Sequence, residues 1–108
     1  MIYTIEEIVR RIKPVVEKYQ LPAVYLFGSY ARGTATESSD IDLIVDTTGT
    51  SIKGLFSLGS LYCDLESALE KDVDVITVQS LQQTAMMASE IQFRDQIWKE
   101  KVDLYAVA

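Results

Sequence analysis

GSYARGTATESSDIDLIVD, residues 28–46, joins a glycine turn, a cation and closely spaced acids within one short span. A strand that runs into Gly28 and Ser29 and then into a helical turn presents free backbone N–H groups and a hydroxyl, an arrangement that favours phosphate. Arg32, one turn further on, can add a charge-assisted contact to the same phosphate. A glycine turn alone is weak evidence, but this segment is a candidate phosphate site.

Two acids follow the turn and lie two residues apart in a stretch typical of a β-strand. Side chains with this spacing leave the same face of a strand, so Asp40 and Asp42 can reach one hard cation or two neighbouring ones. Oxygen ligands favour magnesium or manganese over zinc or copper. Because aspartate is a poor strand former, this pair indicates a metal site. Asp46 and Asp72 each lie one further step along the strand from the inferred centre of the metal site, so for these two residues we favour a solvated acidic face.

A third carboxylate is expected beside the first two. Hydrophobic patterning predicts strands at residues 23–27, 41–46 and 73–78. If the first strand ends at the phosphate turn and the second begins at the metal site, these two strands run antiparallel. The helical crossover between residues 51 and 70 suits a parallel pairing of the second and third strands, which places Asp74 beside Asp42. Like charges this close ionise together only with a cation nearby, so the arrangement indicates bound metal.

Helical patterning fills the rest of the chain. Thr4 and Glu7 have capping-box spacing, and an apolar stripe runs from there to Tyr19, with Pro14 expected to kink or split the helix near Arg10. A second helix is predicted over residues 52–69, and residues 80–108 have helical character with a tail that can be extended. We therefore expect one α/β (α+β) domain, residues 1–108, with a small mixed sheet of three to four strands flanked by helices.

Composition excludes several classes of protein. Sixteen acids against ten bases give a net charge of −6, which repels a nucleic-acid backbone, so direct nucleic-acid binding is not expected. The absence of histidine excludes imidazole general bases, Ser-His triads and His-ligated zinc. Gly28 and Gly33 have P-loop spacing, but Thr34 stands where that motif requires lysine, which argues against a Walker-type NTPase.

Cysteine content and hydropathy bear on the compartment, and we predict a soluble, cytoplasmic protein with no membrane partner. Cys63 is the single cysteine, so the chain cannot form an internal disulfide. We see no signal peptide and no apolar run of membrane-spanning length.

The string GSYARG, then SDIDLIVD and later VDVI, resembles the nucleotidyltransferase superfamily that includes polymerase beta. It is most similar to the minimal nucleotidyltransferases, small prokaryotic proteins that form toxin–antitoxin pairs with HEPN-domain toxins. The resemblance covers nearly the whole chain and implies the nucleotidyltransferase fold. It assigns Gly28 and Ser29 to the triphosphate-binding turn, Asp40 and Asp42 to the metal-binding acids, and Asp74 to the third carboxylate.

The resemblance also implies an activity, namely transfer of AMP from ATP to a hydroxyl, usually a tyrosine of the cognate HEPN toxin, which is thereby neutralised. Two Mg²⁺ ions, or Mn²⁺ in their place, would be held by Asp40, Asp42 and Asp74, and Asp74 would act as general base. Arg32 matches the arginine that commonly follows the Gly-Ser pair. Two alternatives stay open, a non-catalytic antitoxin that acts by binding alone and a small-molecule (antibiotic) nucleotidyltransferase, for which a short domain offers little room for an acceptor pocket.

Overall fold

Four strands form one mixed sheet in the order β3-β2-β1-β4 in the computed structural model, which describes residues 2–83 and 88–106. Strand β2 pairs antiparallel with β1 and parallel with β3, and β4 pairs antiparallel with β1. The predicted fold class and both predicted strand pairings are confirmed. The elements in chain order are α1 (Ile5–Tyr19), β1 (Ala23–Phe27), α2 (Gly28–Arg32), β2 (Ile41–Asp46), α3 (Leu55–Leu69), β3 (Val73–Thr77), α4 (Val78–Gln83), α5 (Ala88–Glu100) and β4 (Val102–Ala106).

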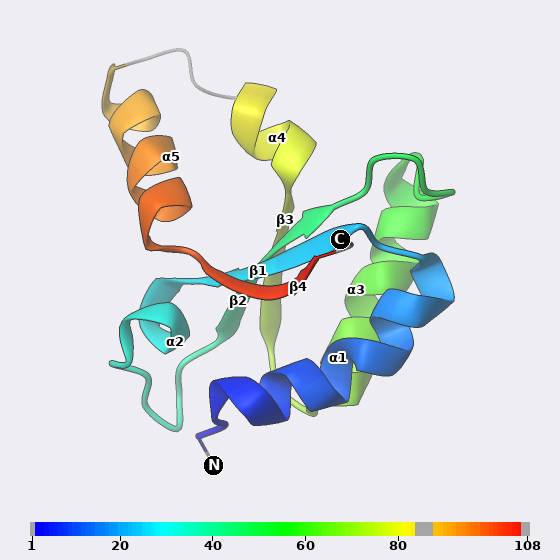
Figure 1. The fold of residues 1–108 in the computed structure, drawn as a ribbon, viewed down its shortest axis with the longest axis horizontal. Helices are drawn as coiled ribbons and strands as arrows, with labels where there is room; N and C mark the ends of the chain where they lie inside the picture. Colours follow the sequence, from blue (N-terminus) through cyan, green and yellow to red (C-terminus); the bar gives the residue numbers. More distant parts are fainter. Residues whose placement is uncertain (1, 84–87, 107–108) are drawn as a thin grey trace.

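The two faces of the sheet carry different side chains. Helices α1 and α3 lie side by side against one face (Figure 1), where they bury the alternate residues Ile41, Leu43 and Val45 of β2. Because successive strand residues point to opposite faces, Asp42 lies on the other face. Helix α5 reaches that second face, since Trp98 packs edge-on against Tyr25 of β1, with 5.3 Å between the ring centroids. The core is thus on one side of the sheet and the acids are on the other.

Helix α1 begins at the predicted capping box. The hydroxyl of Thr4 accepts a hydrogen bond from the backbone N–H of Glu7, and the Glu7 carboxylate accepts one from the backbone N–H of Thr4, both at 3.1 Å. The helix then continues as one element through Pro14 to Tyr19. The predicted split near Arg10 is therefore wrong, because the apolar stripe that packs α1 against the core spans the proline and outweighs the one lost donor.

Two predicted boundaries move by a few residues. Helix α3 begins at Leu55 instead of residue 52, because Gly54 has φ +108, a conformation that lies outside the helix. Strand β3 ends at Thr77, whose hydroxyl accepts a hydrogen bond from the N–H of Ser80 and so helps to start α4. The helical character and extended tail of residues 80–108 are confirmed by α5 and β4, while residues 84–87, 107 and 108 lie outside the described part. None of the described helices is long and apolar enough to span a bilayer.

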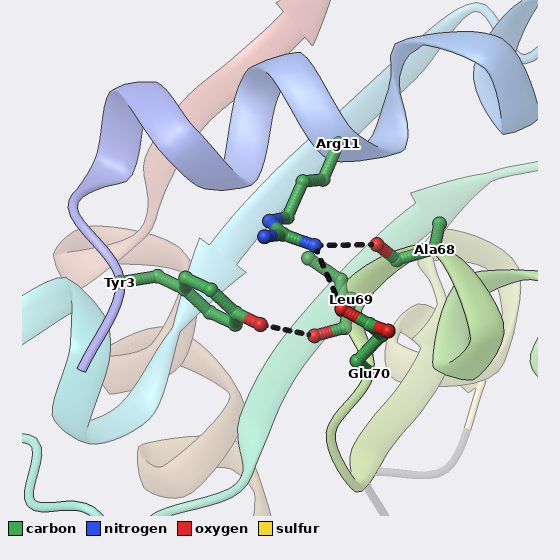
Figure 2. A network of polar contacts seen from close by, with 5 residues as sticks. All are labelled: Tyr3, Arg11, Ala68, Leu69 and Glu70. Atoms are coloured by element: carbon green, nitrogen blue, oxygen red, sulfur yellow. Dashed lines mark hydrogen bonds and ion pairs between the residues drawn. The ribbon is translucent and has the colours of Figure 1, made fainter. Parts of the chain in front are cut away.

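A network of polar contacts ties the start of the chain to the end of α3 (Figure 2). The hydroxyl of Tyr3 donates a 2.7 Å hydrogen bond to the carbonyl of Leu69, and Nη1 of Arg11 donates to the carbonyl of Ala68 at 3.4 Å. The same nitrogen pairs with the carboxylate of Glu70 at 3.4 Å. The last carbonyls of a helix have no partner inside the helix, so these contacts satisfy them and hold the turn that leads into β3. The position of Asp74 depends on that turn.

Candidate nucleotide and metal site

The turn after β1 is built on Gly28, which packs directly against an acid of the next strand. Gly28 has φ +75, and a Cβ at this position would overlap Oδ2 of Asp42 and come within 3.1 Å of its carboxyl carbon. The register of the antiparallel pair places Phe27 opposite Asp42, so strand pairing itself brings the turn to the acid. The predicted phosphate turn and the predicted metal ligand are therefore neighbours.

Helix α2, which follows Gly28, is a single short turn. The carbonyl of Ser29 accepts a hydrogen bond from the N–H of Thr34 at 2.9 Å, and Gly33 closes the turn with φ +77. Tyr30, only 5% exposed, anchors the turn in the core. Phe27, the N-cap residue, contributes no side-chain capping bond, and the first N–H groups of a helix need partners from outside it. The turn thus offers backbone donors next to the acids.

Asp42 and Asp74 are direct partners across the parallel pair β2 and β3, as the sequence predicts. Asp42 is half-buried and Asp74 is exposed. Burial raises the pKa of Asp42 to about 6, and the negative charges of Asp74 and Asp40 add to this rise, while Arg32 opposes it. The three acids and the arginine therefore act on one another electrostatically.

Asp40 lies just before β2, at the end of a loop that is fixed at several points. The N–H of Thr36 donates to the hydroxyl of Ser39 at 2.8 Å, and Nζ of Lys71 donates to the carbonyl of Glu37 at 2.8 Å. The side chain of Asp40 itself is exposed. The loop therefore places Asp40 at the edge of the site, beside the start of β3, where its carboxylate can turn toward the other two acids.

The donor set fits a hard divalent cation. All three candidate ligands are carboxylates. Burial and, after it, the like charges of Asp74 and Asp40 raise the pKa of Asp42, and a bound cation would relieve the repulsion between these charges. Among the described residues, no three acidic, cysteine or histidine side chains are yet close enough together to enclose an ion. Asp42 and Asp74 are adjacent, and a turn of the exposed Asp40 side chain toward them would complete a set of three carboxylates.

Arg32 lies between the acids and the last turn of α5. Its Nη1 is 3.8 Å from the Oε2 of Glu100, and the side chain remains about half exposed. Its charge also lowers the pKa of Asp42, in opposition to burial and the other acids. Arg32 can therefore turn from Glu100 toward a phosphate without loss of a buried contact.

Sequence reasoning missed what α5 contributes. Gly28 and Arg32 line a cavity of about 230 Å³ together with residues of α5, which we call the α2–α5 cavity. The residues from α5 are spaced three, four and seven apart, a pattern that places them on one helical face. That spacing was the only signal in the sequence, and by itself it does not tell which element the face contacts. The residues that α5 supplies are Phe93, Gln96, Ile97 and Glu100.

The acids that the sequence assigns to a solvated face have different surroundings. Asp46 accepts hydrogen bonds from the N–H of Thr48 at 2.9 Å and from Nε2 of Gln79 at 3.3 Å. Burial opposes the shift, but these hydrogen bonds lower the pKa of Asp46. Asp72 is exposed, and its backbone carbonyl accepts from the N–H of Ile41. Asp46 thus stabilises a loop, and neither side chain joins the paired acids Asp42 and Asp74.

A mixed sheet with a glycine turn packed against paired aspartates is the arrangement of a nucleotidyltransferase. The family described as "Polymerase beta, Nucleotidyltransferase" matches residues 10–106 of this chain. The chain therefore belongs to the polymerase beta nucleotidyltransferase family.

Named relatives and solved structures agree with this assignment. The chain is 33% identical over 103 residues to the protein adenylyltransferase MntA of Shewanella oneidensis, covering 94% of this chain and 70% of that protein. A crystal structure of a toxin–antitoxin pair with AMP-PNP contains a chain that is 27% identical, with a TM-score of 0.68 over 92% of this chain and 73% of that one. A structure of a tri-AMPylated Shewanella oneidensis HEPN toxin in complex with MNT antitoxin has a TM-score of 0.64 at 23% identity, over 95% and 73% of the two chains, which shows the shared fold.

Proposed function

We propose that this protein transfers AMP from ATP to a hydroxyl group and that residues 1–108 act as one catalytic domain. The observation that carries the proposal is the contact of Gly28 with Asp42 beside Asp74, because it unites a phosphate turn with paired carboxylates. Family membership and the 33% identity to a named protein adenylyltransferase support the same reaction.

Each candidate residue has a separate role in this proposal. The backbone N–H groups of Gly28 and Ser29 bind the triphosphate, and Arg32 leaves Glu100 to neutralise one of its oxygens. Asp40, Asp42 and Asp74 would hold Mg²⁺ or Mn²⁺, which when bound supplies charge neutralisation at the α-phosphate. The acceptor hydroxyl attacks the α-phosphorus in line and pyrophosphate leaves.

Asp74 is the proposed general base. Its carboxylate is exposed, so an acceptor hydroxyl can approach it from solvent, and the chain contains no histidine to take the proton instead. Asp42 is half-buried between Gly28 and Asp74 and is therefore better placed to bind than to accept a proton from a docked partner. In this proposal the half-buried Asp42 acts as a ligand alone, whereas the exposed Asp74 is both a ligand and the base.

The proposed acceptor is a tyrosine of a HEPN-domain toxin, which the transfer neutralises in the cytoplasm. Two observations support this partner, namely the resemblance of the sequence to minimal nucleotidyltransferases and the toxin–antitoxin structure with AMP-PNP that contains a similar chain. The HEPN toxin that carries three AMP groups was solved with an antitoxin of the same fold, which supports AMP as the transferred group.

The test is to mix the purified protein with ATP, Mg²⁺ and the product of the neighbouring gene, and to measure the mass of that product. We expect a mass increase equal to one or more AMP groups, lost in Asp74→Asn and kept in the matched control Asp72→Asn, whose side chain is exposed outside the proposed ligand set. If no transfer occurs and an Asp40→Ala, Asp42→Ala double variant still suppresses toxicity, the protein neutralises its partner by binding alone.

A further inference from the structure

The α2–α5 cavity lies beside the phosphate turn. Gly28 and Arg32 line it from one side, and α5 lines it from the other. Its volume of about 230 Å³ is below the roughly 300–1,000 Å³ of sites that enclose a whole small molecule. A cavity of this size fits one part of a nucleotide. Because it adjoins the phosphate turn, a nucleotide whose phosphates bind at that turn can place another part in the cavity.

The side chains of the cavity suit a flat, apolar ring. Phe27 and Phe93 contribute aromatic rings, and the buried Ile97 contributes an aliphatic surface. Phe93 is 59% exposed, which is unusual for so large an apolar side chain and leaves its ring free to stack. Aromatic side chains stack on nucleobases of every kind, because every base has a π-face.

Polar groups lie at the rim of the same cavity. Nε2 of Gln96 donates a 2.5 Å hydrogen bond to Oε1 of Glu100, whose other oxygen is 3.8 Å from Arg32. If Arg32 turns to a phosphate, Glu100 is left with one fewer cation and with an oxygen free to accept. An ionised carboxylate only accepts hydrogen bonds, so it favours a base edge that presents an amino group.

We propose that the α2–α5 cavity holds the base of the nucleotide, with Phe93 stacking on it and Glu100 accepting from an exocyclic amino group. This inference rests on the proposed nucleotidyl transfer and adds its specificity-determining residues. Adenine carries an exocyclic amino group at position six, whereas uracil carries only carbonyls around its ring, which would face the carboxylate of Glu100 unfavourably. The cavity therefore selects ATP over UTP.

The first test separates base binding from phosphate binding. Calorimetry on the full chain with Mg²⁺ would compare α,β-methylene-ATP, which cannot be cleaved at the α-phosphate, with inorganic tripolyphosphate, which has no base. We expect Phe93→Ala to weaken binding of the analogue roughly tenfold and to leave tripolyphosphate unchanged. Phe56→Ala is the matched control, because Phe56 is 98% exposed at the start of α3, and it should change neither affinity.

The outcomes distinguish this inference from the proposed function. If the wild-type protein binds both probes and Phe93→Ala weakens both equally or neither, the base pocket is wrong while the phosphate and metal site stands. If the wild-type protein binds neither probe, the proposed function fails and the base pocket fails with it. If Phe93→Ala slows transfer to the partner but leaves the analogue bound as before, the cavity receives the acceptor side chain instead.

A second variant tests the choice of base. The wild-type protein should bind α,β-methylene-ATP several-fold more tightly than the corresponding UTP analogue, and Glu100→Gln should reduce that preference because an amide can donate as well as accept. Tripolyphosphate again serves as the control, since its affinity reports any gain in phosphate binding that comes only from the release of Arg32 from its ion pair with Glu100. An unchanged preference in Glu100→Gln would overturn the role of Glu100.

Discussion

The carboxylate of Asp42 packs so closely against the backbone of Gly28 that no side chain fits at position 28. A Cβ at Gly28 would overlap Oδ2 of Asp42 and lie within 3.1 Å of its carboxyl carbon. The glycine therefore serves two needs, a positive φ of 75° and the absence of any side chain. This contact fixes the distance between the phosphate turn and Asp42.

Gly28→Ala should abolish nucleotide binding and AMP transfer, because the methyl group must push Asp42 out of the site. Gly33→Ala is the matched control, since Gly33 has a similar φ of +77 but no atom within 4 Å of its Cβ position. That variant should cost about 1–2 kcal/mol of stability from backbone strain alone and keep its activity. Binding of α,β-methylene-ATP and thermal unfolding measure the two effects. Equal loss of activity in both variants would show that strain, and not the contact with Asp42, is decisive.

The raised pKa of Asp42 predicts how stability depends on pH in metal-free buffer. A carboxyl whose folded-state pKa of about 6 exceeds its ordinary value of 3.8 binds more protons when folded, so its contribution to stability falls as the pH rises through that window. Asp42→Asn should therefore stabilise the protein near pH 7.5, by about 1 kcal/mol after allowance for solvent screening, and have little effect near pH 4.

Chemical denaturation at the two pH values checks this prediction, and the exposed Asp72→Asn is the control. An equal gain from Asp42→Asn at both pH values would mean that the like charges and the burial around Asp42 do not destabilise the folded protein. The same variant should lose nucleotidyl transfer, because it removes a proposed metal ligand.

Two buried tyrosine hydroxyls should respond in opposite ways to removal. The hydroxyl of Tyr3 donates to the carbonyl of Leu69, so Tyr3→Phe leaves that carbonyl without its partner and should cost about 1–2 kcal/mol (Figure 2). The hydroxyl of Tyr30 is buried with no partner among the described residues, so Tyr30→Phe should be neutral or slightly stabilising. Urea denaturation of both variants measures the difference, and a loss in Tyr30→Phe as large as in Tyr3→Phe would contradict it.

Arg32→Ala should weaken ATP binding about tenfold with little change in stability. The arginine is half exposed and its ion pair with Glu100 is worth at most about 1 kcal/mol, whereas a contact with a triphosphate is charge-assisted at both ends. Arg10→Ala, which removes the same charge from an exposed position on α1, is the control for net charge. If both variants lower the affinity for Mg²⁺-ATP equally, only the overall charge of the protein matters.

The sequence by itself determined the features that depend on local spacing. The capping box at Thr4, the alternation of β2 and the pairing of Asp42 with Asp74 all follow from the periods of helices and strands and from the length of a crossover connection. Such patterns repeat over a few residues, so they can be read without knowledge of distant parts of the chain. The fold class and the family could be predicted from the sequence for the same reason.

Only the tertiary structure decided what lies across from the site. The pairing of Arg32 with Glu100 and the α2–α5 cavity depend on where α5 rests, and that position is set by contacts such as Trp98 against Tyr25 of β1. These features arise from packing between elements far apart in sequence, and the free energy of such packing is shared among many weak contacts that no short motif encodes.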